Sequence, residues 1–144
     1  MTARSQNYEE LRRDFRWQIP TRFNIGEDIC DKWAASDRTA LILQTAPGQA
    51  DTYSFADLKR LSNQLANVLA GRGVVRGDRV ALLLPQSLET VVTHIAIYKL
   101  GAIAVPMAAL FGVEALQYRL GDADACALVT NAAVVAKIAE IRDA

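Results

Sequence analysis

The sequence predicts an α/β fold built on a parallel sheet, with one antiparallel hairpin near its start. The run Val80–Leu84 is apolar without alternation, which is typical of a strand covered on both faces. From that strand onward, strand-length and helix-length segments alternate, as they do in right-handed βαβ units. Upstream, the Pro-Gly pair within Ala46–Ala50 separates two segments of strand character and predicts a hairpin turn. At 144 residues, of which 51% are hydrophobic, the chain can bury a core of its own.

The N-terminal segment, residues 1–23, is polar and charged and carries a few aromatic side chains. It is expected to form a short helix or an arm that lies on a larger body. Residues 24–144 are expected to form the α/β unit itself.

A helix is predicted to begin at Asn24, whose side chain can cap it, with Glu27 completing the capping pattern. Ile25, Ile29 and Trp33 follow at intervals of four residues, so they share one face of that helix. This face is expected to be the apolar one.

The hairpin strands are predicted at Thr39–Thr45 and Thr52–Phe55. Ser54 is expected to cap the helix that follows, with Asp57 in its first turn near the positive end of the helix dipole. The predicted apolar stripe of this helix consists of Phe55, Leu58, Leu61, Leu65, Val68 and Leu69.

The helix after the buried strand is predicted to begin at Ser87, and its inner half, Val91–Leu100, is apolar nearly all round. Such a helix should be buried on more than one side. The remaining predicted elements are the strands Ala102–Pro106 and Ala127–Thr130 and the helices Val113–Leu120 and Ala132–Arg142.

The charge balance argues against a nucleic acid or an anionic membrane as partner, since sixteen basic residues match sixteen acidic ones. No segment has the apolar length of a membrane span or of a signal peptide, so a cytoplasmic location is expected. Cys30 and Cys126 lie far apart, with His94 as the single histidine, which argues against a zinc site or a disulfide scaffold. Both cysteines are expected to be small buried side chains.

Three glycines, Gly71, Gly73 and Gly77, form the pattern GxGxxxG. A dinucleotide fingerprint has a different spacing and lies between a strand and the helix that follows, whereas this pattern ends a helix and precedes a strand. Helix-capping and turn glycines are therefore the favoured interpretation.

Three further features invite a functional interpretation and are better explained structurally. His94 has no nucleophile or orienting acid in register with it, and Glu89 falls on another face of the same helix. Asp122 and Asp124 flank a turn, where carboxylates commonly cap backbone amides. Arg76–Asp78 spells an adhesion tripeptide but precedes a strand as a simple turn. No catalytic, cofactor-binding or metal-binding residue is assigned.

Three motifs follow one another within Thr52–Met107. The first begins a helix and comprises Tyr53, Ser54, Phe55 and Leu58. The second enters a strand and comprises Gly77, Asp78, Arg79, Val80, Ala81, Leu82, Leu84 and Pro85. The third leads into the next strand and comprises Ala96, Lys99, Gly101, Ala102, Ile103, Val105 and Pro106. In this order, and followed by the YRL and ALVT segments, they resemble the AMP-binding, adenylate-forming enzymes, in particular the acetyl-CoA and medium-chain acyl-CoA synthetases.

The resemblance implies that residues 24–144 are a subdomain of the large N-terminal domain of an ATP-dependent acyl-CoA synthetase. Such enzymes convert a carboxylate, ATP and CoA into acyl-CoA, AMP and pyrophosphate through an acyl-adenylate, with Mg²⁺ as the metal. The family's phosphate-handling motifs do not occur in this sequence. The chain is therefore expected to be truncated, inactive by itself, without bound ATP, Mg²⁺ or CoA, and partnered by the rest of its own polypeptide.

Alternatives remain open. The longer protein could be another adenylate-former, such as a peptide-synthetase adenylation domain or an aryl-CoA ligase, and the chain could also be a non-catalytic α/β interaction module. The apolar helix Val91–Leu100 suggests a surface made to be covered, through which copies of the chain could associate. The loop Met107–Gly112 resembles one near the CoA channel of some synthetases, but Leu110 and Phe111 replace a polar residue there and are expected to line a channel or belong to the core.

Overall fold

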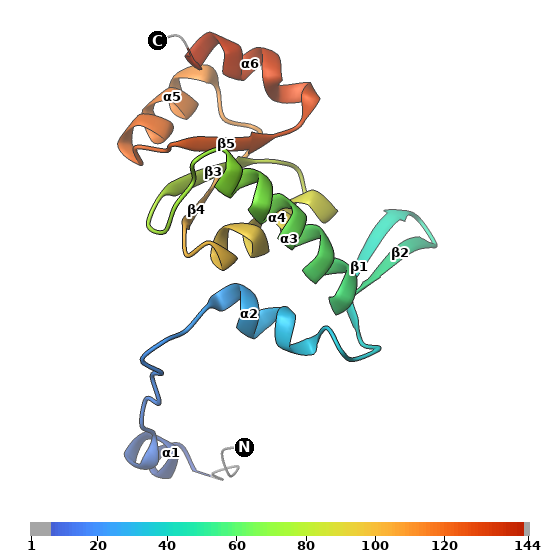
Figure 1. Ribbon diagram of the computed structural model, residues 1–144, viewed down its shortest axis with the longest axis vertical. Coiled ribbons are helices and arrows are strands. Elements are labelled where there is room, and N and C mark those ends of the chain that lie inside the picture. The colour runs from blue at the N-terminus through green and yellow to red at the C-terminus, as the bar shows by residue number, and fades with distance from the viewer. Residues whose placement is uncertain (1–6, 143–144) are drawn as a thin grey trace.

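The computed structural model describes residues 7–142, and its body is an α/β/α sandwich (Figure 1). Within these residues the main sheet is parallel and has the order β4-β3-β5. The strands are β3 (Arg79–Leu83), β4 (Ile103–Pro106) and β5 (Ala127–Thr130). Ala81, at the middle of β3, lies opposite Val105 on one side and Leu128 on the other. The predicted parallel α/β fold is confirmed.

Four helices cover the two faces of this sheet (Figure 1). Helices α3 (Phe55–Gly71) and α4 (Leu88–Lys99) lie on one face, and α5 (Val113–Asp122) and α6 (Ala132–Arg142) lie on the other. The sheet therefore has a hydrophobic core on each side, as the unbroken apolar run of its central strand requires.

The central strand β3 supplies side chains alternately to the two cores. Val80 and Leu82 contact the α3–α4 side, while Ala81 and Leu83 contact the α5–α6 side. All four are buried, as expected for a strand with neighbours on both edges and helices on both faces.

Glycines with positive φ form the turns that lead into β3 and β4. Residues with a Cβ rarely adopt positive φ. Gly77 (φ 88°) lies in the turn before β3, where the Asp78 carboxylate accepts a hydrogen bond from the Val75 amide at 2.8 Å. Gly101 (φ 68°) follows the C-terminus of α4, and its carbonyl accepts from the Gly77 amide at 3.0 Å. This hydrogen bond joins the two turns and so aligns β3 with β4.

The predicted hairpin is present and is longer than expected. Strands β1 (Thr39–Ala46) and β2 (Gln49–Ser54) pair antiparallel, and the turn is the two-residue Pro47–Gly48, with Gly48 at φ 77°. The hairpin extends away from the main sheet (Figure 1).

Helix α3 begins as predicted, with a reciprocal cap. The Ser54 hydroxyl accepts from the Asp57 amide at 3.1 Å, and the Asp57 carboxylate accepts from the Ser54 amide at 3.1 Å. The predicted apolar stripe was wrong at Val68, which is exposed, while Ser62 and Ala66 are buried. The Ser62 hydroxyl donates to the Leu58 carbonyl at 2.6 Å, so burying it leaves no polar atom unsatisfied.

Helix α4 is covered on several sides, as its apolar sequence predicted. It packs against α2 and α3 and against the sheet, and none of its residues is exposed except Glu89. The sequence suggested that the apolar helix Val91–Leu100 would leave a surface uncovered, but other elements of this chain cover it. The exposed apolar side chains lie elsewhere.

Helix α1 (Tyr8–Asp14) confirms a short N-terminal helix, but it does not lie on the body. Figure 1 shows it at the end of an extended segment that leads away from the sandwich. None of its side chains is buried, and Trp17, in the segment that follows, is 80% exposed.

Helix α2 (Ile25–Ile29) begins at Asn24 as predicted, and the 3₁₀ helix η1 (Asp31–Trp33) continues it. The expected apolar face was wrong: Ile25, Ile29 and Trp33 are largely exposed, while Gly26 and Cys30 are buried. The reason is the close approach of α2 to α4, which only a residue without a Cβ allows at position 26.

Candidate functional site

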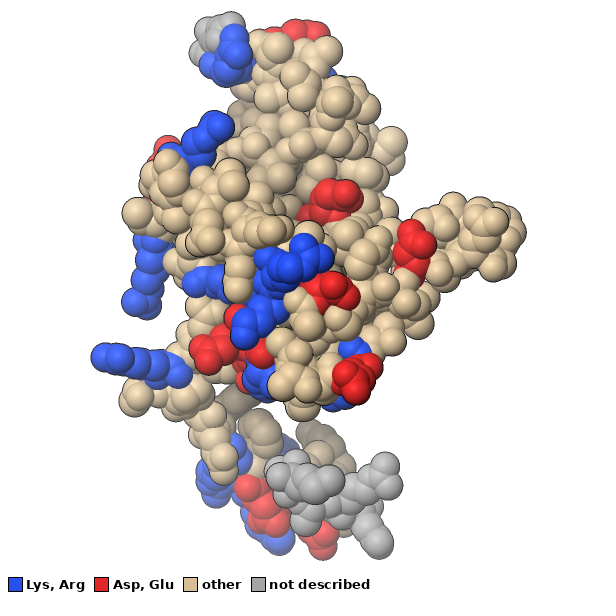
Figure 2. Space-filling model, turned by 45° about the vertical axis from the view of Figure 1, so that its right-hand side comes forward, with Lys and Arg blue, Asp and Glu red and all other residues tan. Residues whose placement is uncertain are grey.

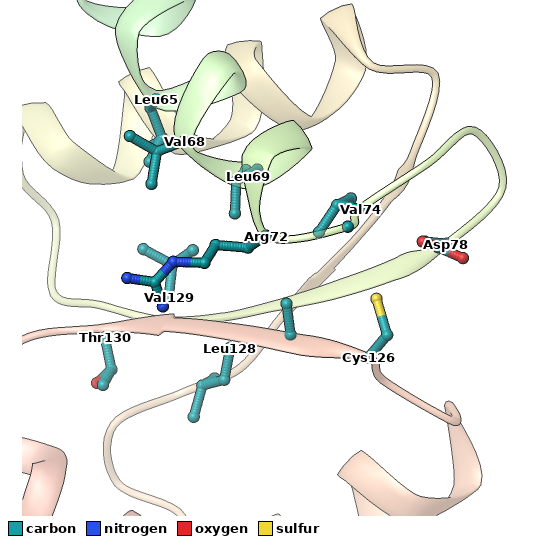
Figure 3. A pocket seen from close by; sticks show the side chains of 12 residues that line it. Leu65, Val68, Leu69, Arg72, Val74, Asp78, Cys126, Leu128, Val129 and Thr130 are labelled. Carbon is teal, nitrogen blue, oxygen red and sulfur yellow. The ribbon is translucent and has the colours of Figure 1, made fainter.

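A groove of about 600 Å³ lies between the end of α3 and the edge strand β5. Its floor is formed by β5, and its wall by Leu65, Val68 and Leu69 of α3 (Figure 3). The lining of this groove is largely apolar, and it includes two charged side chains and a thiol, those of Arg72, Asp78 and Cys126.

These three polar groups lie toward different ends of the groove. In Figure 3 the guanidinium of Arg72 lies over Val129, whereas the carboxylate of Asp78 lies beside the thiol of Cys126. Partial desolvation, followed by the neighbouring Asp78 carboxylate, raises the pKa of the Cys126 thiol. The thiol is therefore protonated at neutral pH, which does not suit a nucleophile.

A second groove, of about 530 Å³, lies on the other face of β5. It is bounded by the end of α5 and by Ile138 and Ile141 of α6, and Leu128 contributes to it from the strand. The outer edge of β5 thus lies between two hollows, one on each face of the sheet.

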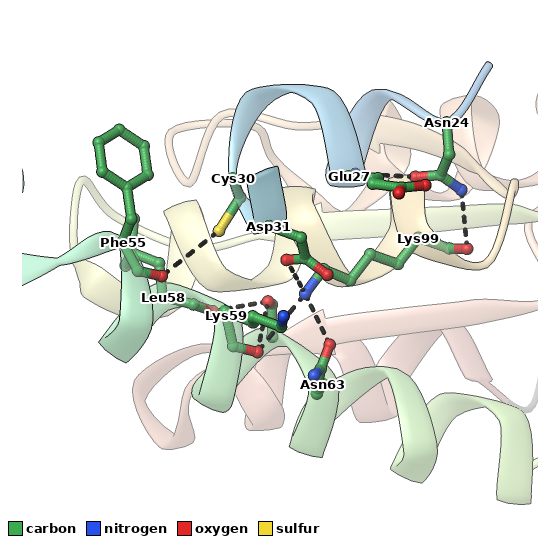
Figure 4. A network of polar contacts seen from close by, with 10 residues as sticks. Asn24, Glu27, Cys30, Asp31, Phe55, Leu58, Lys59, Asn63 and Lys99 are labelled. Carbon is green, nitrogen blue, oxygen red and sulfur yellow. Dashed lines mark hydrogen bonds and ion pairs between the residues drawn. The ribbon is translucent and has the colours of Figure 1, made fainter. Parts of the chain in front are cut away.

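A polar pocket of about 390 Å³ lies where α2, α3 and α4 meet (Figure 4). At its base the Lys99 ammonium lies 2.7 Å from an Asp31 carboxylate oxygen, and both side chains are mostly buried. The same ammonium donates to the Asn63 amide oxygen at 2.6 Å, and the Asn24 amide donates to the Lys99 carbonyl at 3.0 Å. Lys59 lies at the rim of this pocket.

The contacts of this network join segments that are far apart in the sequence, namely α2, η1, α3 and α4. Beside it, the buried Cys30 thiol contacts the Phe55 carbonyl at 3.8 Å, and burial raises the pKa of this thiol. The arrangement fastens α2 and η1 to the body. It offers a cation and hydrogen-bond donors, but no nucleophile with an adjacent base.

The glycines of the GxGxxxG pattern occupy a helix end and a turn, as predicted. Gly71 is the last residue of α3, and Gly73 (φ 94°) allows the chain to turn so that the Val74 amide donates to the Leu69 carbonyl at 3.1 Å. The groups presented at this helix end are carbonyl oxygens, which repel phosphate.

His94 pairs with an aromatic neighbour rather than with an acid. Its Nδ1 lies 3.2 Å from the Tyr98 hydroxyl one turn along α4. Glu89 instead interacts with Ser87, which is the main cause that lowers the pKa of this carboxyl group. His94 and Glu89 are thus not brought together.

The expectation that both Asp122 and Asp124 cap backbone amides was wrong for Asp124. Its carboxylate forms an ion pair with Arg79, whose guanidinium also donates to the Ala123 carbonyl at 3.0 Å and to the Asp124 carbonyl at 2.8 Å. Arg79 therefore fastens the turn before β5, which includes Asp124 at φ 47°, to the start of β3.

Two expectations of burial were also wrong. Cys126 is exposed rather than buried, because it precedes an edge strand with no strand beyond it among the described residues. In the Met107–Gly112 loop, Leu110 is 96% exposed, while Phe111 packs into the core beneath α5. The Lys137 ammonium donates to the Phe111 carbonyl at 2.9 Å, which ties this loop to α6.

Sequence reasoning missed the Lys99–Asp31 pair and the position of Arg72 over β5. Lys99 belongs to one of the three motifs, which marked it as a residue of interest. Nothing in the sequence, however, shows which carboxylate pairs with it. Within residues 7–142, no group of three or more His, Cys, Asp or Glu side chains is placed to hold a metal ion. In the same range, no helix has the length and apolar character needed to cross a membrane.

Figure 2 shows basic and acidic side chains interspersed over the face that it presents. This agrees with the equal numbers of the two kinds in the sequence. The broad single-sign patch that would attract a polyanion is not seen on this face.

Comparison with known proteins gives the family. Residues 30–144 match the model of the AMP-binding enzyme family. The mitochondrial acyl-coenzyme A synthetase ACSM3 of Homo sapiens is 30% identical over 133 residues, which cover 87% of this chain and 23% of the human protein. An acetyl-coenzyme A synthetase of Thiobacillus denitrificans is 34% identical over 118 residues, covering 81% of this chain and 18% of that enzyme.

Solved structures agree. The acyl-CoA synthetase of Brucella canis superposes with a TM-score of 0.87 at 30% identity, over 94% of this chain and 27% of that one. The anthranilate CoA ligase AuaEII, in complex with anthranoyl-AMP, superposes with a TM-score of 0.73 at 31% identity, over 87% of this chain and 23% of that one. The chain spans about a quarter or less of the length of these relatives. On this evidence the chain belongs to the AMP-binding enzyme family.

Proposed function

We propose that this chain is the N-terminal part of an ATP-dependent acyl-CoA synthetase, which joins a carboxylic acid to CoA through an acyl-adenylate. The observation that carries the proposal is the match of residues 30–144 to the family, together with the superposition on the Brucella canis acyl-CoA synthetase. The residues of the three recurring motifs support it, because they perform structural tasks: Gly77 and Gly101 form turns, and Ser54 caps a helix.

Two observations on the described residues argue against binding of Mg²⁺ and of the ATP phosphates by this chain. No cluster of metal-binding side chains lies within residues 7–142, and the glycine-bearing end of α3 presents carbonyl oxygens. We therefore assign ATP, Mg²⁺ and CoA binding to polypeptide outside this chain, and we derive no chemical step from the residues present.

In this proposal the chain contributes a framework, and its partner is the rest of a longer polypeptide. Residues 24–144 act as the folded unit, and residues 1–23 act as an arm. The short parallel sheet supports this view, since three strands are few for a sheet that carries helices on both faces.

The test is a pyrophosphate-release assay on the 144-residue chain with ATP, Mg²⁺, CoA and acetate, butyrate or octanoate. The expected result is no release above the rate without protein, and no heat of ATP binding in calorimetry. A longer acyl-CoA synthetase assayed in parallel controls for the reagents. Turnover by the 144-residue chain would show that its own residues carry the chemistry and would overturn the proposal.

An aryl-CoA ligase is the second candidate, because the anthranilate CoA ligase AuaEII also superposes on most of this chain, with a TM-score of 0.73. The two candidates differ in the acid that is activated. The test uses two chimeras, in which this chain replaces the corresponding N-terminal part of an acyl-CoA synthetase or of an aryl-CoA ligase. It asks which of the two enzymes this chain can complete. Activity with octanoate only in the first chimera supports the acyl-CoA synthetase, and activity with anthranilate only in the second supports the ligase.

A further inference from the structure

Residues 24–33, which comprise α2, η1 and the residue that caps α2, pack against α3 and α4 with small side chains. Gly26 has no side chain to bury, and the buried side chain of the next turn is that of Cys30, which is 1% exposed. The bulkier Ile25 and Ile29 are each 45% exposed. Because small inward side chains bury little apolar area, hydrophobic contact holds this segment less firmly than a leucine-lined helix.

The polar contacts of this segment converge on one residue of α4, Lys99 (Figure 4). Its ammonium lies 2.7 Å from the Asp31 carboxylate, and its carbonyl accepts from the Asn24 amide at 3.0 Å. A helix of five residues is not stable alone, because its few hydrogen bonds do not offset the cost of ordering its backbone. The position of the segment therefore depends on its contacts with Lys99.

We propose that residues 24–33 form a latch that opens as a unit while the α/β/α sandwich stays folded, and that Lys99 holds this latch closed. Opening would uncover the Cys30 thiol and the apolar side chains that cluster with it, Leu58, Val92 and Ile95. All four side chains are buried while the latch is closed. The movement of one short segment would thus expose a thiol and an apolar surface.

The cores of the main sheet lie apart from the latch. Among the described residues, neither the α3–α4 core nor the α5–α6 core contains a residue of the latch. Residues 34–38 are neither helix nor strand and lead into β1, so they can act as the hinge. Opening also breaks the contact between Trp33 and Phe55, whose ring centroids are 6.4 Å apart. Segments with few buried apolar contacts commonly open in this way, at a lower free energy than global unfolding.

The first test is alkylation of the two thiols of the 144-residue chain with iodoacetamide, followed by mass spectrometry at urea concentrations below the unfolding transition. Cys126 is exposed and should react at once. Cys30 should react slowly, at a rate that depends far less on urea than global unfolding does, because opening exposes little surface. A Cys30 rate with the full urea dependence of global unfolding would overturn the inference.

The variant Lys99→Met should speed the alkylation of Cys30 about tenfold or more, with its small urea dependence retained, since one partner of a mostly buried ion pair is lost. Burial raises the pKa of the Cys30 thiol and the Lys99 charge opposes this rise, so a purely electrostatic effect would slow the reaction instead. Lys137→Met is the matched control, because its ammonium donates to the Phe111 carbonyl on the other side of the sheet. It should leave the Cys30 rate unchanged. An equal or slower rate in Lys99→Met would contradict the role of Lys99.

A second variant, Asn24→Asp, leaves the Lys99 side chain in place. It keeps the oxygen that caps α2 by accepting from the Glu27 amide, but an oxygen replaces the nitrogen that donates to the Lys99 carbonyl. Cys30 should then react about twofold to tenfold faster, as expected for the loss of one hydrogen bond. No change in the Cys30 rate would count against Lys99 as the residue that holds the latch.

Hydrogen exchange tests whether the latch opens as one unit. The amides of Asp28, Cys30 and Trp33 donate to carbonyls three or four residues earlier, all within the latch. They should exchange with one common opening constant, equal to that from Cys30 alkylation, while the amides of α4 stay more strongly protected. Three unrelated constants, or protection equal to that of α4, would overturn the inference. The latch rests on contacts between described residues and does not depend on the proposed function.

Discussion

Gly26 shows how one residue fixes the distance between two helices. A Cβ at this position would lie 2.6 Å from Lys99 Cγ and 3.0 Å from the Ile95 carbonyl oxygen of α4. Glycine therefore lets α2 approach closely enough for Asn24 and Asp31 to reach the polar groups of α4. The Lys99 network depends on this approach.

Replacing Gly26 with alanine should lower the free energy of unfolding by about 1–3 kcal/mol, because a packed backbone must move to admit the methyl group. Gly121→Ala is the matched control: nothing lies near its Cβ position in α5, so alanine should be neutral or stabilise by about 0.4–1 kcal/mol. Urea unfolding curves of both variants measure the difference. Equal effects would mean that the close approach of α2 is not required.

The mostly buried Lys99–Asp31 pair should be strongly coupled. In a double-mutant cycle with Lys99→Met and Asp31→Ala, a coupling free energy of about 1–3 kcal/mol is expected, since removing either partner leaves a poorly solvated charge. The exposed pair Lys32–Asp28, treated in the same way, should give about 0.3–0.5 kcal/mol. Similar values for the two pairs would contradict a special role for Lys99.

At the scale of single elements, helix ends follow from neighbouring residues. Helix α3 begins at a reciprocal cap between Ser54 and Asp57, whereas Ser87 at the start of α4 makes no capping bond to the backbone. The hydrogen bonds from Ser54 lower the pKa of Asp57 below its ordinary value of 3.8. A carboxyl group with a lowered folded-state pKa stabilises the protein above its ordinary pKa, and this stability is lost as the pH falls through the lowered value.

Ser54→Ala should therefore cost about 1 kcal/mol of unfolding free energy at neutral pH, as the loss of an N-cap does. The difference from the unmodified protein should shrink at acid pH, because protonated Asp57 no longer gains from the cap in either protein. Ser87→Ala should have a smaller effect at neutral pH. Urea unfolding at neutral and at acid pH measures these free energies. A Ser54→Ala loss that grows on acidification would contradict the predicted direction.

At the scale of the whole molecule, the folded body and the N-terminal arm are energetically separate. Every residue from 7 to 23 is exposed, including aromatic side chains such as Trp17. The body, in contrast, encloses three clusters of buried side chains, two of them on opposite faces of the sheet. The arm can be lost without opening any of these clusters.

Removing residues 1–22 should consequently leave the urea midpoint unchanged, with a loss below about 0.5 kcal/mol. Removing residues 1–30 should destabilise the protein, because it deletes the buried Gly26 and Cys30 and the Asn24 contact with α4. Limited trypsin digestion gives a second measurement: cleavage at Arg12, Arg16 or Arg22 should precede any cut in the body. Equal losses from the two truncations would mean that the arm packs on the body.

The sequence by itself determined the features that depend on residues within a few positions of one another. These include the cap at Ser54, the hairpin turn and the buried character of β3, because a cap, a turn or an apolar run is complete within a short segment. The tertiary structure alone decided the order β4-β3-β5, the meeting of Lys99 with Asp31 and the groove beside β5. It also exposed Cys126 and buried Gly26. Burial and pairing of this kind depend on which distant segments pack together, and the periodicity of one segment carries no information about its neighbour.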